Sequence, residues 1–135
     1  MKDKMTSSFQ SYEQACSQCI DTMYHIAYVA LADERIAEEI VTKVCVSGVH
    51  KYNKCDAETV KFRLFAELYR RCRRKLWFHK PASRSLPPLL QMLTNHDRLL
   101  LAIFFLSGLS QDYVSMIVGV PEEKLETEVR EICVV

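Results

Sequence analysis

The spacing of apolar side chains predicts two long helices in the first part of the chain. Over residues 9–31 apolar positions recur every three or four residues, which is typical of the buried face of an amphipathic helix. Asp33 is placed to cap a second helix, because its carboxylate can accept hydrogen bonds from the open amides of a first turn. Gly48 and the polar residues after it predict the end of this helix. Residues 1–8 are polar, and we expect them to fray.

A third helix is predicted to start at Asp56 or Thr59 and to end near Phe78. Its apolar stripe consists of Phe62, Phe65, Leu68, Tyr69, Cys72 and Leu76. Residues 79–88 contain three prolines and two serines, and proline removes a backbone donor and clashes with a continuing helix. We therefore interpret residues 81–88 as a linker.

After the linker the pattern predicts a short helix over residues 89–93 and then a very apolar one over residues 95–106. Thr94 and Asp97 have the spacing of a capping box at the start of the apolar helix. The sequence therefore marks the first turn of this helix clearly.

The last part of the chain predicts two short helices joined by a tight turn. Ser110 is placed to cap a helix over residues 111–118, and Gly119 is placed to end it in a left-handed conformation. Pro121 then starts the next helix with its φ angle already set. The final helix has an apolar stripe of Leu125, Val129 and Ile132. This pattern is typical of a helix-turn-helix, whose second helix enters a DNA groove.

Together these elements predict an all-α protein made of two small helical domains. We expect the first domain over residues 1–80, the linker over residues 81–88 and a helix-turn-helix domain over residues 89–135. A chain of 135 residues can bury one moderate core or two small ones, and the linker favours two.

Composition excludes some classes of protein. Apolar residues make up 49% of the chain and charged residues 26%, which is typical of a globular protein. No apolar run is long enough to span a membrane, and the first residues lack the pattern of a secretory signal. We therefore expect a cytoplasmic protein with no membrane partner. In that compartment the six cysteines, including the Cys16 and Cys19 pair, are expected to be reduced, buried thiols, and no metal site is expected.

The net charge is only +1, but it is unevenly distributed. Residues 1–60 carry 6 basic and 9 acidic side chains, a net charge of −3. Residues 61–80 carry 8 basic and 1 acidic side chain, a net charge of +7, whereas residues 107–135 carry 2 basic and 6 acidic ones, a net charge of −4. The positive charge is thus concentrated on the third helix, between two acidic regions.

The cations near the end of the third helix are the candidate nucleic-acid-binding residues. They are Arg70, Arg71, Arg73, Arg74 and Lys75. Tyr69, Trp77 and Phe78 add aromatic rings beside them. Single-stranded or melted DNA requires this combination, because cations bind phosphates and flat rings stack on bases. The alternative is a solvated helix end that the helix dipole stabilises, with the aromatic rings in the core.

The second half of the chain keeps the order and spacing of a known motif. The matching positions are Leu93, Arg98, residues 99–106, Gly108, Leu109, Ser110, Val114, Ser115, Ile117, Val118, Gly119 and Pro121. In this pattern the chain resembles the C-terminal promoter-binding region of bacterial sigma factors, particularly the extracytoplasmic-function type. It departs from the family at Tyr113, where an acid is usual, and at Ser115, where alanine is usual.

The first half resembles the same family at residues 37–42 and 70–76, so the resemblance covers roughly residues 12–132 in the family's order. It implies that the basic helix binds and opens promoter DNA. It also implies that core RNA polymerase is bound through Glu34, Glu38 and Glu39, and that an anti-sigma factor is a further partner.

By the same resemblance, the second half would contact DNA through Gln111, Lys124, Thr127 and Arg130. The last helix departs from the family here, because acids follow Pro121 where basic residues are usual. These acids are Glu122, Glu123, Glu126, Glu128 and Glu131. Carboxylates that face phosphates lower the affinity for DNA. Either this helix recognises DNA poorly and leaves specificity to the basic helix, or it has become a surface for a protein partner.

The function expected from the resemblance is sigma-factor-like transcription initiation without catalysis or a cofactor. A sigma-like adaptor or regulator that acts through protein contacts is the second interpretation, and a helical DNA-binding repressor unrelated to polymerase is the third. An enzyme is not expected, because the sequence has no catalytic spacing of His, Cys and Asp and no glycine-rich phosphate loop.

Overall fold

The computed structural model describes residues 4–52, 54–78 and 86–134, with side chains from Tyr12 onward, and every regular element within them is a helix. The prediction of an all-α fold is therefore confirmed. The elements are α1 (Lys4–Leu31), α2 (Glu34–Lys51), α3 (Ala57–Leu76), α4 (Pro88–Gln91), α5 (Asn95–Leu106), α6 (Gln111–Val118) and α7 (Glu122–Cys133).

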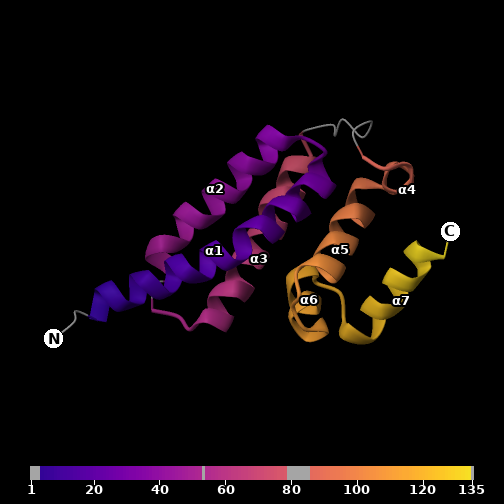
Figure 1. Cartoon of the computed structure of the whole chain (residues 1–135). Coiled ribbons are helices and arrows are strands. Elements are labelled where there is room, and N and C mark those ends of the chain that lie inside the picture. Colours follow the sequence, from indigo (N-terminus) through magenta and orange to yellow (C-terminus); the bar gives the residue numbers. More distant parts are fainter. Residues whose placement is uncertain (1–3, 53, 79–85, 135) are drawn as a thin grey trace.

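Helix α1 is the centre of the arrangement. It contacts α2 and α3, with which it forms a three-helix group, and it also contacts α5. Helix α6 packs on α3 and α5, and α7 packs on α5 and α6 (Figure 1). The two ends of the described chain lie on opposite sides of the molecule (Figure 1).

Most helix starts lie where the capping residues predicted them. The Asp33 carboxylate accepts a hydrogen bond from the Ile36 amide at 3.0 Å, and the Asp56 carboxylate accepts one from the Thr59 amide at 2.7 Å. Thr94 accepts one from the Asp97 amide at 3.1 Å. Each bond satisfies an amide that has no partner inside its own helix.

The predicted helix pair near the C-terminus also has the expected bounds. Helix α6 covers residues 111–118, and Gly119 ends it with φ 75°, which a residue without a side chain adopts at little cost. The Ser110 hydroxyl makes no capping bond to the backbone and donates instead to the Asp112 carboxylate at 2.5 Å. Whether α6 and α7 bind DNA as a helix-turn-helix stays a prediction.

Two predicted helix boundaries are wrong by three residues or more. Helix α1 begins at Lys4, so part of the segment expected to fray is helical, and α2 continues through Gly48 to Lys51. The reason for the second error is a contact between helices. A Cβ atom at Gly48 would overlap the Tyr12 hydroxyl and lie 2.9 Å from the Tyr12 Cζ atom, so the glycine makes room for the ring and does not end the helix.

The described residues form one hydrophobic core, although the sequence favoured two. The same cluster contains Met23 of α1, Phe65 of α3, Ile103 of α5, Val114 of α6 and Leu125 of α7. The two halves of the chain therefore bury apolar surface against each other. The predicted linker lies mostly outside the described residues, since only residues 86–88 of it are covered.

A buried arginine joins the two halves. Arg98 is 2% exposed, and its guanidinium donates hydrogen bonds to the Val29 carbonyl at 3.2 Å, the Leu93 carbonyl at 2.9 Å and the Asn95 side-chain oxygen at 2.5 Å. A weaker bond of 3.5 Å reaches the Ala30 carbonyl. Val29 and Ala30 belong to the last turn of α1, whose carbonyls have no partners inside the helix. Arg98 thus satisfies carbonyls of α1 from the start of α5.

The close approach of Tyr12 to Gly48 predicts the effect of a single methyl group. We expect Gly48→Ala to lower the free energy of unfolding by about 1–3 kcal/mol, because Tyr12 must move away. At an open helical site the same change would instead raise stability by about 1 kcal/mol, so the sign identifies the contact. Chemical denaturation of this variant, measured beside Thr42→Ala on the exposed face of α2, checks the prediction.

A double-mutant cycle tests whether Tyr12 is the cause. Adding Tyr12→Phe removes the hydroxyl that overlaps the new methyl group, so its cost should be smaller in the Gly48→Ala background than in the original chain. Equal costs in both backgrounds would contradict this explanation.

Candidate nucleic-acid interface

The C-terminal end of α3 carries its cations on two sides of the helix. Tyr69 and Cys72 point into the core and are 3% and 0% exposed. Arg70, Arg73 and Arg74 are exposed. Arg71 and Lys75 are half-buried on the side that faces α2. The helical period thus divides one basic run into an outer surface and a surface toward α2.

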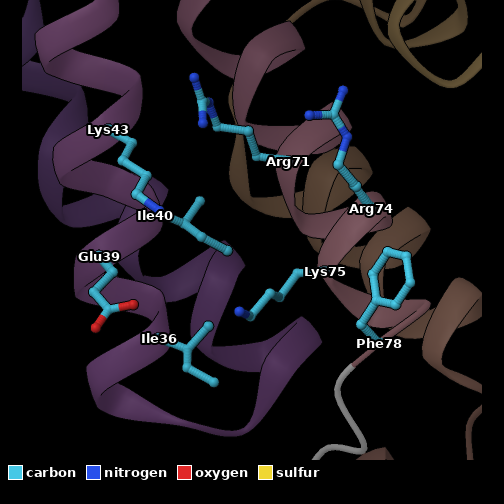
Figure 2. Close-up of a pocket in the computed structure, with 8 residues that line it drawn as sticks. All are labelled: Ile36, Glu39, Ile40, Lys43, Arg71, Arg74, Lys75 and Phe78. Atoms are coloured by element: carbon cyan, nitrogen blue, oxygen red, sulfur yellow. The ribbon is translucent and has the colours of Figure 1, made fainter.

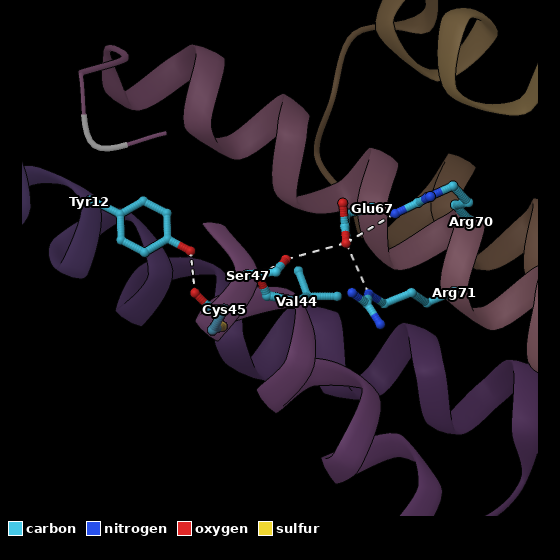
Figure 3. A network of polar contacts seen from close by, with 7 residues as sticks. All are labelled: Tyr12, Val44, Cys45, Ser47, Glu67, Arg70 and Arg71. Carbon is cyan, nitrogen blue, oxygen red and sulfur yellow. Dashed lines mark hydrogen bonds and ion pairs between the residues drawn. The ribbon is translucent and has the colours of Figure 1, made fainter. Parts of the chain in front are cut away.

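Two of the predicted DNA-binding arginines already have an acidic partner in the same helix. The Glu67 carboxylate, whose side chain is 6% exposed, pairs with Arg71 Nε at 2.9 Å and with an Arg70 terminal nitrogen at 3.2 Å. The Ser47 hydroxyl of α2 donates to it at 3.3 Å (Figure 3). Arg71 in particular is turned toward this carboxylate, and its side chain is only 27% exposed. Within the basic run at the end of α3, the cations that remain available to a ligand are therefore mainly Arg73, Arg74 and Lys75.

The charge of Glu67 is maintained by these neighbours. Burial alone raises the pKa of a carboxyl group, but the hydrogen bond from Arg71 and the charges of Arg70 and Arg71 outweigh it and hold the pKa of Glu67 below its ordinary value of 4.5. Glu67 is therefore ionised at neutral pH, and its ion pairs fix the arginines that precede the exposed end of the helix.

A groove of about 430 Å³ lies between α2 and α3. Its lining is Ile36, Glu39, Ile40, Lys43, Arg71, Arg74, Lys75 and Phe78. Figure 2 shows Lys75 reaching from α3 toward α2, with Lys43 and Arg71 on opposite walls. The groove thus combines four cations and one carboxylate with three apolar side chains.

The outer side of the helix end has a second, smaller hollow of about 200 Å³, lined by Arg70, Arg73, Arg74 and Trp77. Arg74 lines both the hollow and the groove, so the two are adjacent. Trp77 is 74% exposed and Phe78 is 84% exposed, although large rings are usually buried. We call this surface, formed by Arg70, Arg73, Arg74, Trp77 and Phe78, the basic-aromatic end of α3.

Exposed rings beside free cations can bind one class of ligand well. Phosphates pair with guanidinium groups, and unpaired bases stack on flat rings that are accessible on both sides. The structure therefore excludes the alternative in which Trp77 and Phe78 are core residues. Of the three predicted rings, only Tyr69 lies in the core.

The predicted polymerase-binding residues all lie on the surface of α2. Glu34, Glu38 and Glu39 are exposed, and Glu39 pairs with Arg35 at 3.6 Å. Glu39 also lines the groove, so this acidic face borders the cations of α3.

The predicted DNA contacts of the second half are exposed but poor in free positive charge. Gln111, Lys124, Thr127 and Arg130 all face solvent. Arg130 of α7 pairs with Glu126 at 3.3 Å. Lys124, the other cation of α7, forms no ion pair with a described residue.

Sequence reasoning missed Lys43 and the role of Glu67. Lys43 is on another helix and joins the groove only through the packing of α2 on α3. The ion pairs of Glu67 could have been predicted from the sequence. Glu67 is the single acid of residues 61–80 and stands three positions before Arg70 and four before Arg71.

The cysteines show no arrangement for metal binding within the described residues, where no three His, Cys, Asp or Glu side chains converge on a common point. Cys16, Cys19 and Cys72 are buried. Burial raises the pKa of Cys72 to about 12, so this thiol stays protonated at neutral pH. Among the helices described, none combines the length and the apolar character needed to cross a lipid bilayer.

Comparisons of this chain with known proteins found no match. The chain matches no protein-family model, no curated protein and no solved structure. The resemblance to sigma factors therefore depends on the sequence positions described above.

The depressed pKa of Glu67 predicts a pH dependence of stability. A carboxyl group with a lower pKa in the folded state stabilises the fold above its unfolded pKa, and this stability is lost as pH falls through the folded value. Glu67→Gln should therefore lower the free energy of unfolding at neutral pH by about 1–2 kcal/mol and flatten its decline below pH 4.5. Urea denaturation at several pH values, with the exposed Glu13→Gln as control, measures both effects. If the free energy of unfolding of the variant declined below pH 4.5 as steeply as that of the original chain, the assignment to Glu67 would be refuted.

Proposed function

We propose that this chain is a sigma-factor-like transcription initiation protein that binds core RNA polymerase and promoter DNA. Its role is non-catalytic, and a partnership with polymerase implies that it acts in the cytoplasm. The basic-aromatic end of α3 is the DNA contact, and the acidic face of α2 is the polymerase contact.

The observation that carries the proposal is the exposure of Trp77 and Phe78 beside Arg73 and Arg74. Burying such rings would gain roughly 1.5–3 kcal/mol each, so their exposure favours a binding role. Stacking on a base contributes about 1–3 kcal/mol and is available only on an unpaired strand. The surface therefore favours DNA that is melted or single-stranded over closed duplex.

The groove between α2 and α3 extends the same contact. Lys43 and Lys75 lie where a strand leaving the basic-aromatic end would meet further positive charge, because Arg74 belongs to both surfaces. Glu34 and Glu38 lie on the same helix as Lys43 and remain exposed. A polymerase bound to α2 would thus be adjacent to the bound DNA.

Helix α7 contributes little to DNA binding in this proposal. Glu122, Glu123 and Glu126 are exposed. Lys124 lies beside them and forms no ion pair with another described residue. Each carboxylate near a phosphate opposes binding, so specificity comes mainly from α3.

Two observations favour the alternative of a sigma-like adaptor that works through protein contacts. Glu67 neutralises part of the charge of Arg70 and Arg71, and α7 presents a mainly acidic surface. Co-purification with core RNA polymerase is expected for both candidates, and its absence would favour a repressor unrelated to polymerase.

DNA binding should depend on the arginines that are free. We expect Arg73→Ala with Arg74→Ala to weaken binding to a single-stranded oligonucleotide by at least about tenfold. Each lost phosphate contact should also reduce the slope of log K against log salt concentration by about 0.7. Fluorescence anisotropy titrations at several salt concentrations measure both quantities. Trp77→Ala should weaken single-strand binding more than duplex binding, because stacking needs an unpaired base.

The matched control is Arg63→Ala with Lys54→Ala, which removes the same charge from exposed positions outside the groove and the hollow. An equal loss of affinity in the control would mean that net charge alone drives binding. Unchanged binding by the Arg73 and Arg74 variant would reject α3 as the DNA contact.

A further inference from the structure

A second groove of about 430 Å³ lies between the α4–α5 connection and α7, on the half of the chain that follows the linker. Its floor is apolar and contains Leu93, Leu100 and Ile132. Asp97, Glu128 and Glu131 also line it, together with Thr94 and His96, and no lysine or arginine among the described residues lines it. The groove thus has an apolar floor and an anionic rim, and we call it the acidic groove.

The acidic groove has apolar surface that is not covered in the described chain. Met92, which lines it, is 73% exposed, and Leu93 and Ile132 are only half-buried. An apolar floor that remains open to solvent favours an occupant, and the acids of the rim favour one that is cationic.

The basic-aromatic end of α3 has the opposite properties. Trp77 and Phe78 extend from the helix end as apolar rings, and Arg73 and Arg74 lie beside them on the preceding turn. Apolar rings surrounded by cations are complementary in charge and in apolar character to an apolar groove lined by acids.

The two surfaces do not meet within one chain. Trp77 and Phe78 are exposed, so neither fills the acidic groove of its own chain. Helix α5 contacts both α3 and α7 and lies between them in Figure 1. A second chain can bring the two surfaces together.

We infer that the acidic groove binds the basic-aromatic end of α3 from a second copy of this chain. Each copy supplies one projection and one groove. Two copies therefore either exchange both contacts in a closed dimer or form a longer head-to-tail assembly.

Self-association covers the residues that bind DNA in the proposed function. Arg73, Arg74 and Trp77 can occupy the acidic groove or contact nucleic acid, but not both at once. This consequence depends on the proposed function, whereas the association itself does not.

The test is self-association measured without DNA. Sedimentation velocity of the full chain at low salt should show a mass above that of the monomer, which rises with protein concentration. Trp77 is the single tryptophan of the chain, so its emission should shift to shorter wavelength over the same concentration range as it leaves water. A monomer at every concentration, with constant emission, would overturn the inference.

Charge reversal identifies the surfaces. The variants Glu128→Lys with Glu131→Lys, and Arg73→Glu with Arg74→Glu, should each associate at least about tenfold more weakly than the original chain. An equimolar mixture of the two should associate again. The unchanged projection of the first variant then meets the unchanged groove of the second, and lysines in the other groove face glutamates on the other projection. Glu123→Lys with Glu126→Lys, which changes α7 outside the groove by the same charge, should associate like the original chain.

Circular dichroism first establishes that each variant is folded. Folded variants that associate like the original chain, or a mixture that stays monomeric, would refute the pairing. A chain that stays monomeric but binds single-stranded DNA through Arg73 and Arg74 would reject the self-association and leave the proposed function intact.

Discussion

The packing of the second half of the chain onto the first depends on a buried guanidinium group. Arg98 donates to carbonyls in the last turn of α1, where the helix dipole is negative, and no carboxylate of the described residues pairs with it. Burial lowers the pKa of Arg98, but an arginine stays charged in this setting. Leu93 and Asn95 accept two further hydrogen bonds from within the second half, so the oxygens of α1 complete the set of acceptors around the buried cation. Helix α5 is held against α1 in this way, and α6 and α7 pack on α5.

This packing uses one side of the three-helix group and leaves the end of α3 free. Leu64, Phe65 and Leu68 lie in the core shared by both halves. Beyond Cys72 few apolar side chains of the helix are buried in the core. Arg73 and Arg74 in its last turn, and the rings of Trp77 and Phe78 that follow, therefore extend into solvent. Glu67 neutralises part of the charge just before this turn, which reduces repulsion inside the helix without affecting its tip. The fold thus separates the charge that stabilises α3 from the charge that is available to a ligand.

Features that depend on neighbouring residues in the chain could be predicted from the sequence. The Thr94 cap, the bounds of α5 and α6, and the left-handed Gly119 are all set by residues within one or two turns. Features that depend on distant contacts could not. Gly48 resembles a helix breaker until the Tyr12 ring is known to lie against it, and Arg98 reaches a carbonyl 69 positions away. The same limit applies to the candidate site, where the basic run was evident but the inward turn of Arg71 and the contribution of Lys43 follow from the packing of α2 on α3.

The proposed role requires that the chain direct polymerase to a start site and that the tip of α3 take part. In vitro transcription with purified core RNA polymerase and a library of genomic DNA fragments measures both requirements. We expect defined transcripts that appear only when this chain is added and that are lost when Trp77, Arg73 and Arg74 are replaced by alanine. Transcripts that do not depend on the chain, or that persist with the altered helix end, would contradict the proposed function.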